Sequence, residues 1–444
     1  MKVIKLRRGY NIKLIGETVR TVEQAPFPPK VAFKPTDFEG MKPKLLVQVG
    51  DEVKVGTPLA FDKKNERVKI ISHVSGKVSE IVRGERRVIE AIVIEPDGKQ
   101  TDEGLNLDKE NFNKESIIET LLKSGLFLNF VQRPFNKIAN PADTPRDIFI
   151  SAMDSAPLAA EDSFILESNE SSFQKGLDIL SHLTSGKVRL SFKPADKTFA
   201  EFNNCELYNF KGPHPAGNVG VHIHHISPIK NANDIVWSCS VQAVIRIGRL
   251  FETGKINSEI IVKVAGSAAE KRYYYKTIIG AGVSSFIGTI EEDSRMISGN
   301  VLTGKKIEET GFIGFKDNLI TVIPEATKPE FLGWLNPGFS KRSWWKTFVS
   351  AIITPKKAFQ ADTNIGGGNR SIVINSIYEE VVPMRILPSY LIKSILAEDI
   401  EEMEALGIYE VSEEDFALCE YICPSKTEFQ HIIRKGLNLM EKEG

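Results

Sequence analysis

The sequence lacks the features that mark secreted, membrane-spanning and nucleic-acid-binding proteins. It has only four cysteines in 444 residues, too few for a disulfide framework, which favours a reducing cytosolic compartment. Its most apolar segments, such as 348–353, stop far short of the roughly 18 uninterrupted apolar residues that a membrane span needs. The beginning of the chain is basic but has neither the apolar stretch nor the cleavage site of a secretory signal. We therefore expect a soluble protein that meets a membrane only through a partner.

An excess of charge of one sign is also missing, since 57 Lys and Arg residues face 58 Asp and Glu residues. This balance leaves no electrostatic case for binding nucleic acid. With 41% hydrophobic and 26% charged residues, the composition is that of an ordinary globular protein. At about 150 residues per domain, the length predicts roughly three domains.

The first hundred residues are rich in short strands and turns. Apolar and polar residues alternate through 45–60 and again through 74–82, each time around glycines. Two strand–glycine–strand units joined by a hairpin resemble the barrel-sandwich fold of biotinyl and lipoyl carriers. In those carriers a hairpin lysine holds the prosthetic group, whereas here Asn65 takes that place, and Lys63 and Lys64 are out of register. We expect a structural barrel-sandwich rather than a working carrier.

From about residue 111 the pattern changes to strands that alternate with helices. Apolar residues at helical spacing predict a helix over 114–125 that ends at Gly125. Residues 234–255 are typical of a strand running into a helix that ends near Gly254. This alternation predicts a Rossmann-like βαβ layer structure. Further strands are expected at 147–154, 187–192 and 204–210, with a helix at 171–183.

The remaining residues divide into a strand-rich and a helix-rich part. Strand spacing after residue 257 predicts a small β-grasp-like (SLBB-like) module, and amphipathic segments after Thr347 predict a helical bundle. The expected fold class is therefore multidomain, α/β and α+β. The expected domains are a barrel-sandwich hybrid at 1–105, a Rossmann-like domain at 106–256, a β-grasp domain at 257–330, and a linker with a C-terminal helical bundle at 331–444.

Four phrases in a fixed order carry a family resemblance. They are RPFNKIANP (133–141), IFISAMDSAPLAAE (148–161), GPHPAGNVGVHIHHISPI (212–229) and RMISGNVLTGKK (295–306). Through them the chain resembles, over essentially its whole length, the NqrA subunits of sodium-pumping NADH:quinone reductases. The resemblance implies a peripheral subunit on the cytoplasmic side of the bacterial inner membrane. It would dock on membrane subunits of a complex that oxidises NADH, reduces quinone and exports sodium.

The same resemblance extends to the flavin subunit of respiratory complex I and the C subunit of the Rnf complex. Those relatives bind flavin through a glycine-rich loop, because glycines let backbone N–H groups approach a phosphate. In 125–137, the matching stretch, only Gly125 remains and bulky residues fill the loop. We therefore expect this chain to bind no cofactor itself, and the resemblance implies that NADH, flavins and iron–sulfur clusters belong to other subunits. The alternatives are an autonomous flavin-dependent NADH dehydrogenase-type subunit, as in Rnf, and a carrier or assembly scaffold.

The cysteines support the same expectation for iron–sulfur clusters. Each cluster needs four thiolates. Cys419 and Cys423 offer two, while Cys205 and Cys239 lie in a different predicted domain. We interpret the pair at 419 and 423 as small buried residues of a helical core.

A quinone site is the ligand-binding hypothesis that the sequence supports. The space where relatives place flavin could form an apolar cleft for a quinone, with an arginine or histidine donating a hydrogen bond to a carbonyl. The opposite interpretation is that the aromatic residues simply fill the vacated site as core. The candidate quinone-binding residues are Phe127, Phe130, Arg133, Phe135, His214 and His222.

Two further segments contain residues that could have a functional role. HIHH at 222–225 would place His222 and His224 on one face of a strand, but no acidic residue stands at ligand spacing, so hydrogen-bonding roles are favoured over a metal. Residues 331–345 hold three tryptophans beside basic side chains, which predicts contact with partner subunits ahead of contact with lipid. No catalytic residue follows from sequence spacing.

Overall fold

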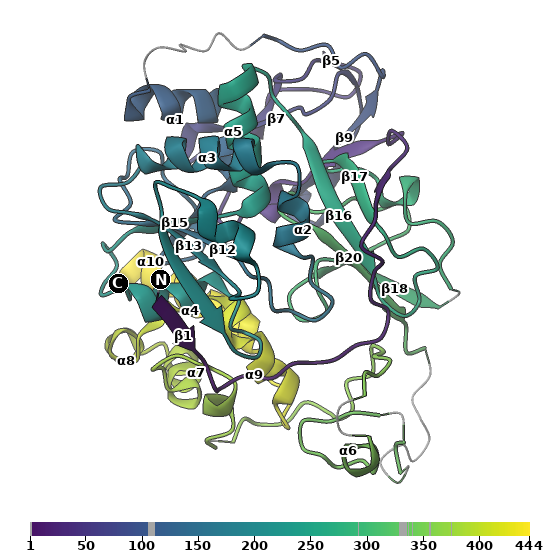
Figure 1. Cartoon of the computed structure of the whole chain (residues 1–444), viewed down its shortest axis with the longest axis vertical. Coiled ribbons are helices and arrows are strands. Elements are labelled where there is room, and N and C mark those ends of the chain that lie inside the picture. The colour runs from purple at the N-terminus through teal and green to yellow at the C-terminus, as the bar shows by residue number, and fades with distance from the viewer. Residues whose placement is uncertain are drawn as a thin grey trace.

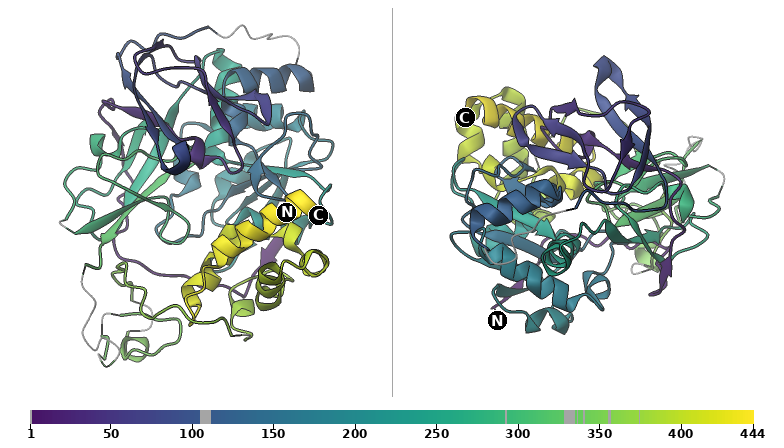
Figure 2. Two further views of the ribbon diagram at one scale, coloured as in Figure 1. Left: turned by 180° about the vertical axis from the view of Figure 1, so that it is seen from behind. Right: turned by 90° about the horizontal axis from the view of Figure 1, so that it is seen from above.

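The computed structural model describes residues 2–104, 112–291, 293–327, 335, 337–339, 341–354, 357–373 and 375–444. Within these residues the chain forms four sheets and a group of C-terminal helices (Figure 1). Figure 2 shows the barrel-sandwich strands and the C-terminal helices toward opposite ends of the long axis. The expected combination of α/β and α+β units is confirmed.

The barrel-sandwich unit consists of two small sheets packed around an aliphatic core. Leu59, Val74, Val78 and Ile92 are fully buried between them. The β6–β7 hairpin turns at the exposed Lys63 and Lys64. One sheet has the order β3 (Val31–Phe33), β9 (Ile89–Pro96), β8 (Gly76–Arg83) and β5 (Glu52–Val53), and the other β4 (Pro43–Leu45), β6 (Pro58–Asp62) and β7 (Asn65–Ile71).

The α/β unit is built on a seven-stranded sheet whose first five strands are parallel. The three central parallel strands, at 148–152, 188–192 and 236–240, are largely buried, as expected of strands covered on both faces. The strand order is β1 (Lys2–Lys5), β14 (Glu206–Lys211), β13 (Val188–Phe192), β12 (Ile148–Ala152), β15 (Val236–Ser240), β10 (Val131–Arg133) and β11 (Lys137–Ile138).

Two helices of this unit pack unusually closely because each has a glycine at the crossing. A Cβ on Gly248 would lie 1.7 Å from the carbonyl oxygen of Ser172, and one on Gly176 would lie 2.2 Å from that of Val244. The glycines therefore fix helix α3 against helix α5, and α5 begins where β15 ends. The helices are α1 (Lys114–Lys123), α2 (Asp162–Leu166), α3 (Glu170–Ser181), α4 (Val219–Ile226) and α5 (Val241–Thr253).

The β-grasp unit is a mixed six-stranded sheet. Its central strand β16 pairs in parallel with β20 and antiparallel with β17. The order is β19 (Lys305–Ile307), β18 (Ser294–Ser298), β20 (Leu319–Pro324), β16 (Glu259–Ala265), β17 (Tyr274–Ile278) and β2 (Val22–Gln24).

The C-terminal helices and one face of helix α4 together form a second hydrophobic core. Leu391, Ile395, Phe429, Ile433 and Leu437 are fully buried there. None of the helices in the described part of the chain is long and apolar enough to cross a bilayer. The helices of this core are α7 (Pro388–Ala397), α8 (Ile400–Ala405), α9 (Ala417–Ile422) and α10 (Phe429–Glu443), and the short helix α6 (Ser350–Ile353) lies outside it.

The beginning of the chain differs from the expected domain at 1–105. Strand β1 lies at the edge of the α/β sheet and β2 at the edge of the β-grasp sheet. Residues 6–21, here termed the N-terminal strap, run between these edges past the C-terminal helices (Figure 1). On the way the Gly9 N–H donates to the Glu380 carbonyl at 2.8 Å, and the Ile15 N–H to the Phe359 carbonyl at 3.0 Å.

Candidate functional site

The stretch that corresponds to the flavin loop of the relatives is packed as core. After α1, Gly125 adopts a left-handed conformation with φ of 68° and turns the chain into a short 3-10 helix, Leu126–Asn129. The rings of Phe127 and Phe130 are fully buried, with centroids 5.6 and 5.4 Å from that of Trp237. These two candidate quinone residues thus support the interpretation that aromatic side chains fill the space.

Arg133 and Phe135 lie next to these residues but point toward the C-terminal helices. The Arg133 guanidinium lies 3.0 Å from the Glu414 carboxylate and 3.7 Å from that of Asp415. The Phe135 ring packs edge-on against Tyr409 at 5.9 Å. In this structure both side chains serve the contact between the α/β sheet and the C-terminal helices.

The histidines of 214–225 lie in and before helix α4, so the expectation of a strand at HIHH was wrong. The backbone of this segment forms hydrogen bonds at helical spacing, although its side chains alternate as in a strand. The hydroxyl of Ser155 lies 3.1 Å from His214 Nδ1, and His222 Nε2 donates to the Ala216 carbonyl at 2.8 Å. Burial lowers the pKa of both imidazoles to about 4, so each is neutral at physiological pH.

The two other histidines of this segment are also engaged in hydrogen bonds. His224 Nδ1 lies 2.7 Å from the Glu410 carboxylate, and His225 Nε2 donates to the Pro383 carbonyl at 2.7 Å. In the part of the chain that the structure describes, no group of three or more His, Cys, Asp or Glu side chains could hold a metal ion. These histidines fasten helix α4 to its neighbours.

The cysteine pair is buried, as expected. Cys419 and Cys423 are both fully buried around Tyr378, whose hydroxyl lies 3.1 Å from the Cys423 sulfur. Hydrogen bonds from Tyr378 and Thr427 lower the pKa of the Cys423 thiol against the opposing effect of burial. Cys205 and Cys239 lie in the α/β unit, away from this pair.

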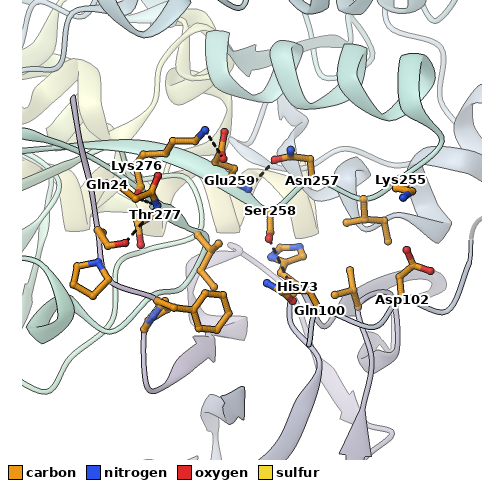
Figure 3. Close-up of a pocket in the computed structure, with 17 residues that line it drawn as sticks. Gln24, His73, Gln100, Asp102, Lys255, Asn257, Ser258, Glu259, Lys276 and Thr277 are labelled. Carbon is orange, nitrogen blue, oxygen red and sulfur yellow. Dashed lines mark hydrogen bonds and ion pairs between the residues drawn. The ribbon is translucent and has the colours of Figure 1, made fainter. Parts of the chain in front are cut away.

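A cavity of about 360 Å³ lies where the barrel-sandwich unit, the β-grasp sheet and the segment joining α5 to β16 meet (Figure 3). We call it the junction cavity. None of the six sequence-predicted quinone residues lines it. Its lining comes from six separated parts of the chain: residues 24–28, Val55, His73, Gln100 with Asp102, residues 255–259 and residues 276–278.

Two buried polar atoms at this cavity have no hydrogen-bond partner among the described residues. They are Nδ1 of His73 and Oγ1 of Thr277, and the two residues are only 3% and 5% exposed. The imidazole of His73 packs between the rings of Phe33 and Phe315, at 5.1 and 5.9 Å. An unpaired buried polar group costs about 1–3 kcal/mol, so a water molecule or ligand that reached these atoms would recover part of that free energy.

The cavity has nearly balanced charge. Burial, followed by the nearby Arg246 charge, lowers the pKa of His73 to about 3, so its imidazole is neutral. Lys276 forms an ion pair of 2.7 Å with Glu259, and both are drawn together in Figure 3. The exposed Lys255 and Asp102 are the remaining lining charges and have opposite signs. Such a lining suits a neutral ligand better than an ion.

Apolar side chains complete the walls of the junction cavity. They are Pro26, Phe27, Pro28, Ile256 and Ile278. Phe27 is 49% exposed, which gives the cavity an apolar edge open to solvent. No sequence pattern indicates this site, since its residues stand in unrelated loops and only the fold brings them together.

Comparison with known proteins identifies similar chains along the whole length. Family models match for the NqrA N-terminal barrel-sandwich hybrid domain over residues 4–97, the NqrA second alpha/beta domain over 112–256, and the NQRA C-terminal domain over 261–309. The NqrA subunit of the Na(+)-translocating NADH-quinone reductase of Yersinia pseudotuberculosis serotype O:1b (strain IP 31758) is 38% identical, over 100% of both chains. The same subunit of Neisseria meningitidis serogroup B (strain ATCC BAA-335 / MC58) is 37% identical, again over 100% of both.

Among solved structures, an NAD+-reducing NiFe-hydrogenase in the air-oxidized state is similar at a TM-score of 0.37. The two are 10% identical, and the match covers 76% of this chain and 62% of that chain. A likeness this slight carries no argument.

Proposed function

The chain belongs to the NqrA family of Na(+)-translocating NADH-quinone reductase subunits, and we propose that it binds the quinone ring of such a reductase in the junction cavity. As a subunit of an oxidoreductase complex, the chain works together with other subunits. We further propose that it sits peripherally on the cytoplasmic side of the membrane, on membrane subunits that carry the redox groups.

The observation that carries the quinone proposal is the pair of unpartnered polar atoms in a cavity of neutral character. A quinone ring is flat and uncharged and has carbonyl oxygens that only accept hydrogen bonds. The Thr277 hydroxyl and the His73 imidazole, in the tautomer with its proton on Nδ1, are the donors that such a ring requires. A volume of about 360 Å³ lies within the usual range for ligand sites.

On this proposal the chain supplies binding and orientation rather than electrons. The packing of Phe127 and Phe130 against Trp237 supports a chain without flavin, since aromatic rings occupy the loop that would approach a phosphate. A neutral His73, with a pKa of about 3, holds a carbonyl by a hydrogen bond and is a poor proton donor near pH 7. Reducing equivalents reach the quinone from redox groups of other subunits.

Exposed apolar side chains around α6 support docking on a membrane subunit. Ile352 is 82% exposed, Phe339 67%, Ile353 63% and Leu335 60%. The Trp345 indole N–H donates to the Ile422 carbonyl at 3.2 Å, which ties this segment to the C-terminal helices. Apolar side chains grouped on a projecting segment are characteristic of protein contact sites.

Photo-crosslinking of the whole complex with an azido-quinone tests the site. We expect labelled peptides from residues 24–28, 73 or 255–278, and the labelling should disappear with excess quinone. Labelling of 125–137 or 211–225 would instead favour the site expected from the sequence. Labelling confined to other subunits would contradict quinone binding by this chain.

Steady-state kinetics give a second test. His73→Phe and Thr277→Val each remove one donor, and we expect the KM for quinone to rise about tenfold, as for one hydrogen bond of roughly 1.4 kcal/mol. His182→Phe is the matched control, because His182 is exposed at the end of α3. His73→Gln retains an amide donor and should recover part of the affinity. An unchanged KM in both cavity variants would refute the assignment.

A further inference from the structure

A second, much smaller crevice lies at the carboxyl end of the parallel strands of the α/β sheet. From β12 the chain continues to β13 on one side, while β15 returns on the other side, so the strand order reverses between β12 and β15. Ligands of open α/β sheets bind at such a switch point. The crevice is lined by Asp162, Ser240, Gln242, Arg246, Ile260, Phe315, Lys316, Asp317 and Asn318.

The N-terminus of helix α5 opens onto this crevice. Ser240 caps the 13-residue helix by accepting the Ala243 N–H at 3.3 Å. The Gln242 side chain both donates to the Ile261 carbonyl at 2.8 Å and accepts the Ile261 N–H at 2.9 Å. These two hydrogen bonds hold the N-terminal end of α5 against β16. The partial positive charge of the helix N-terminus therefore faces the β-grasp sheet.

The second and independent feature is a buried cation without a counterion. Arg246 lines the crevice and is only 3% exposed. Its Nη2 donates to the Asn129 side chain at 2.7 Å and its Nε reaches the Gln242 carbonyl at 3.4 Å, but Nη1 has no partner among the described residues. A guanidinium buried without a carboxylate costs several kcal/mol unless another group neutralises it.

The remaining charges of the crevice leave it net positive. Burial and the nearby Asp154 raise the pKa of Asp162 to about 8, so this carboxyl is largely protonated at pH 7. Asp317, which accepts the Ser298 hydroxyl at 2.5 Å, adds one negative charge against the two positive charges of Arg246 and Lys316. Lys316 as a whole residue is more than a third exposed. Burial around its ammonium group nevertheless lowers the pKa of that group to about 8.

We propose that this crevice binds one small monovalent anion of halide size, held by Arg246, Lys316 and the α5 N-terminus. Its volume of about 20 Å³ suits a single atom or water molecule and leaves no room for a phosphate group. Helix N-termini with a nearby cation are common anion sites. A water molecule would fill the space but would leave the Arg246 charge uncompensated. The crevice shares no lining residue with the junction cavity, and the proposal does not depend on quinone binding.

Thermal unfolding of the full-length chain in chloride tests the proposal. The chain is transferred to sodium gluconate and titrated with sodium chloride or bromide at constant ionic strength, so that general screening stays fixed. We expect a saturable rise of the midpoint, as for any ligand that binds only the folded state. Crystals grown in bromide should show an anomalous scattering peak beside Arg246 Nη1.

Variants separate the site from a general salt effect. Lys316→Gln changes an exposed loop residue and should weaken the apparent chloride affinity about tenfold. Lys306→Gln is the matched control, because its exposed ammonium does not line the crevice. Arg246→Gln should abolish the response. The proposal is overturned if the midpoint does not saturate, if the control weakens the response as much as Lys316→Gln, or if bromide crystals show no peak beside Arg246.

Discussion

Replacing Arg133 by methionine tests whether a buried ion pair fixes the C-terminal helices to the α/β sheet. Only 3% of the Arg133 side chain and 1% of the Asp415 side chain are exposed, and the two charges lie 3.7 Å apart. Methionine keeps the apolar stem of the arginine but removes its charge. The Asp415 carboxylate then stays buried without a cation.

We expect this change to lower the free energy of unfolding by about 3 kcal/mol at neutral pH. Breaking one side of a buried ion pair costs about 3–5 kcal/mol, and the low end applies because Asp415 keeps other partners. It still accepts the N–H and the hydroxyl of Ser412, both at 3.0 Å. The matched control is Lys137→Met, which breaks the partly exposed pair with Glu441 at the same interface and should cost less than about 1 kcal/mol.

The cost should depend on pH in a defined direction. Burial raises the pKa of Asp415 in the folded protein even though Arg133 opposes the shift. A carboxyl with a raised folded pKa loses stability as the pH rises through that pKa, and the loss vanishes below its unfolded pKa, where both states are protonated. Because removal of Arg133 raises the folded pKa further, the variant should differ from the parent more at about pH 7.5 than at about pH 4.

Urea unfolding followed by far-ultraviolet circular dichroism measures the effect, with limited proteolysis to report release of the C-terminal helices. The double variant Arg133→Met/Asp415→Asn should recover part of the loss, since it leaves no unpaired carboxylate at position 415. The reasoning fails if Arg133→Met costs no more than Lys137→Met, or if its cost is the same at both pH values.

Two further outcomes follow from the packed loop and the buried cysteines. The purified chain should be colourless, and a flavin band that survives gel filtration, or iron near one atom per chain, would contradict a cofactor-free subunit. Cys419→Ala and Cys423→Ala should each cost about 1 kcal/mol of stability and leave sodium pumping by the complex largely intact. Loss of pumping in a normally assembled complex would give these thiols a chemical role.

Local patterns in the sequence were sufficient for most elements of the fold. Helix α5 ends at Thr253 before Gly254, close to where its glycine stop predicts, and the parallel strands β12 and β13 lie within the expected segments. The strand predicted at HIHH was wrong because a four-residue pattern cannot distinguish a strand from a helix whose ends are set by tertiary contacts. The edge strand Lys2–Lys5 was not predicted, because a short strand says nothing of the sheet that it joins.

The candidate site shows a stricter limit of sequence reasoning. The filled loop at 125–137 was predictable from the sequence, because bulky residues replace glycines within one short segment. The junction cavity was not, because His73 and Thr277 are 204 positions apart in sequence, and neither stands in a motif. What marks them is an unsatisfied hydrogen bond, a property that exists only once the chain is folded.

The N-terminal strap sets the order in which parts of the chain can fold while the ribosome synthesises it. Strand β1 can pair only after β14 at 206–211 has emerged, and β2 only after β17 at 274–278. The barrel-sandwich strands between residues 31 and 96 depend on no later strand for their pairing, so they can close first while the preceding residues wait unpaired. The strap is therefore made before its partner strands but reaches its place after them, and it closes two sheets that are already built.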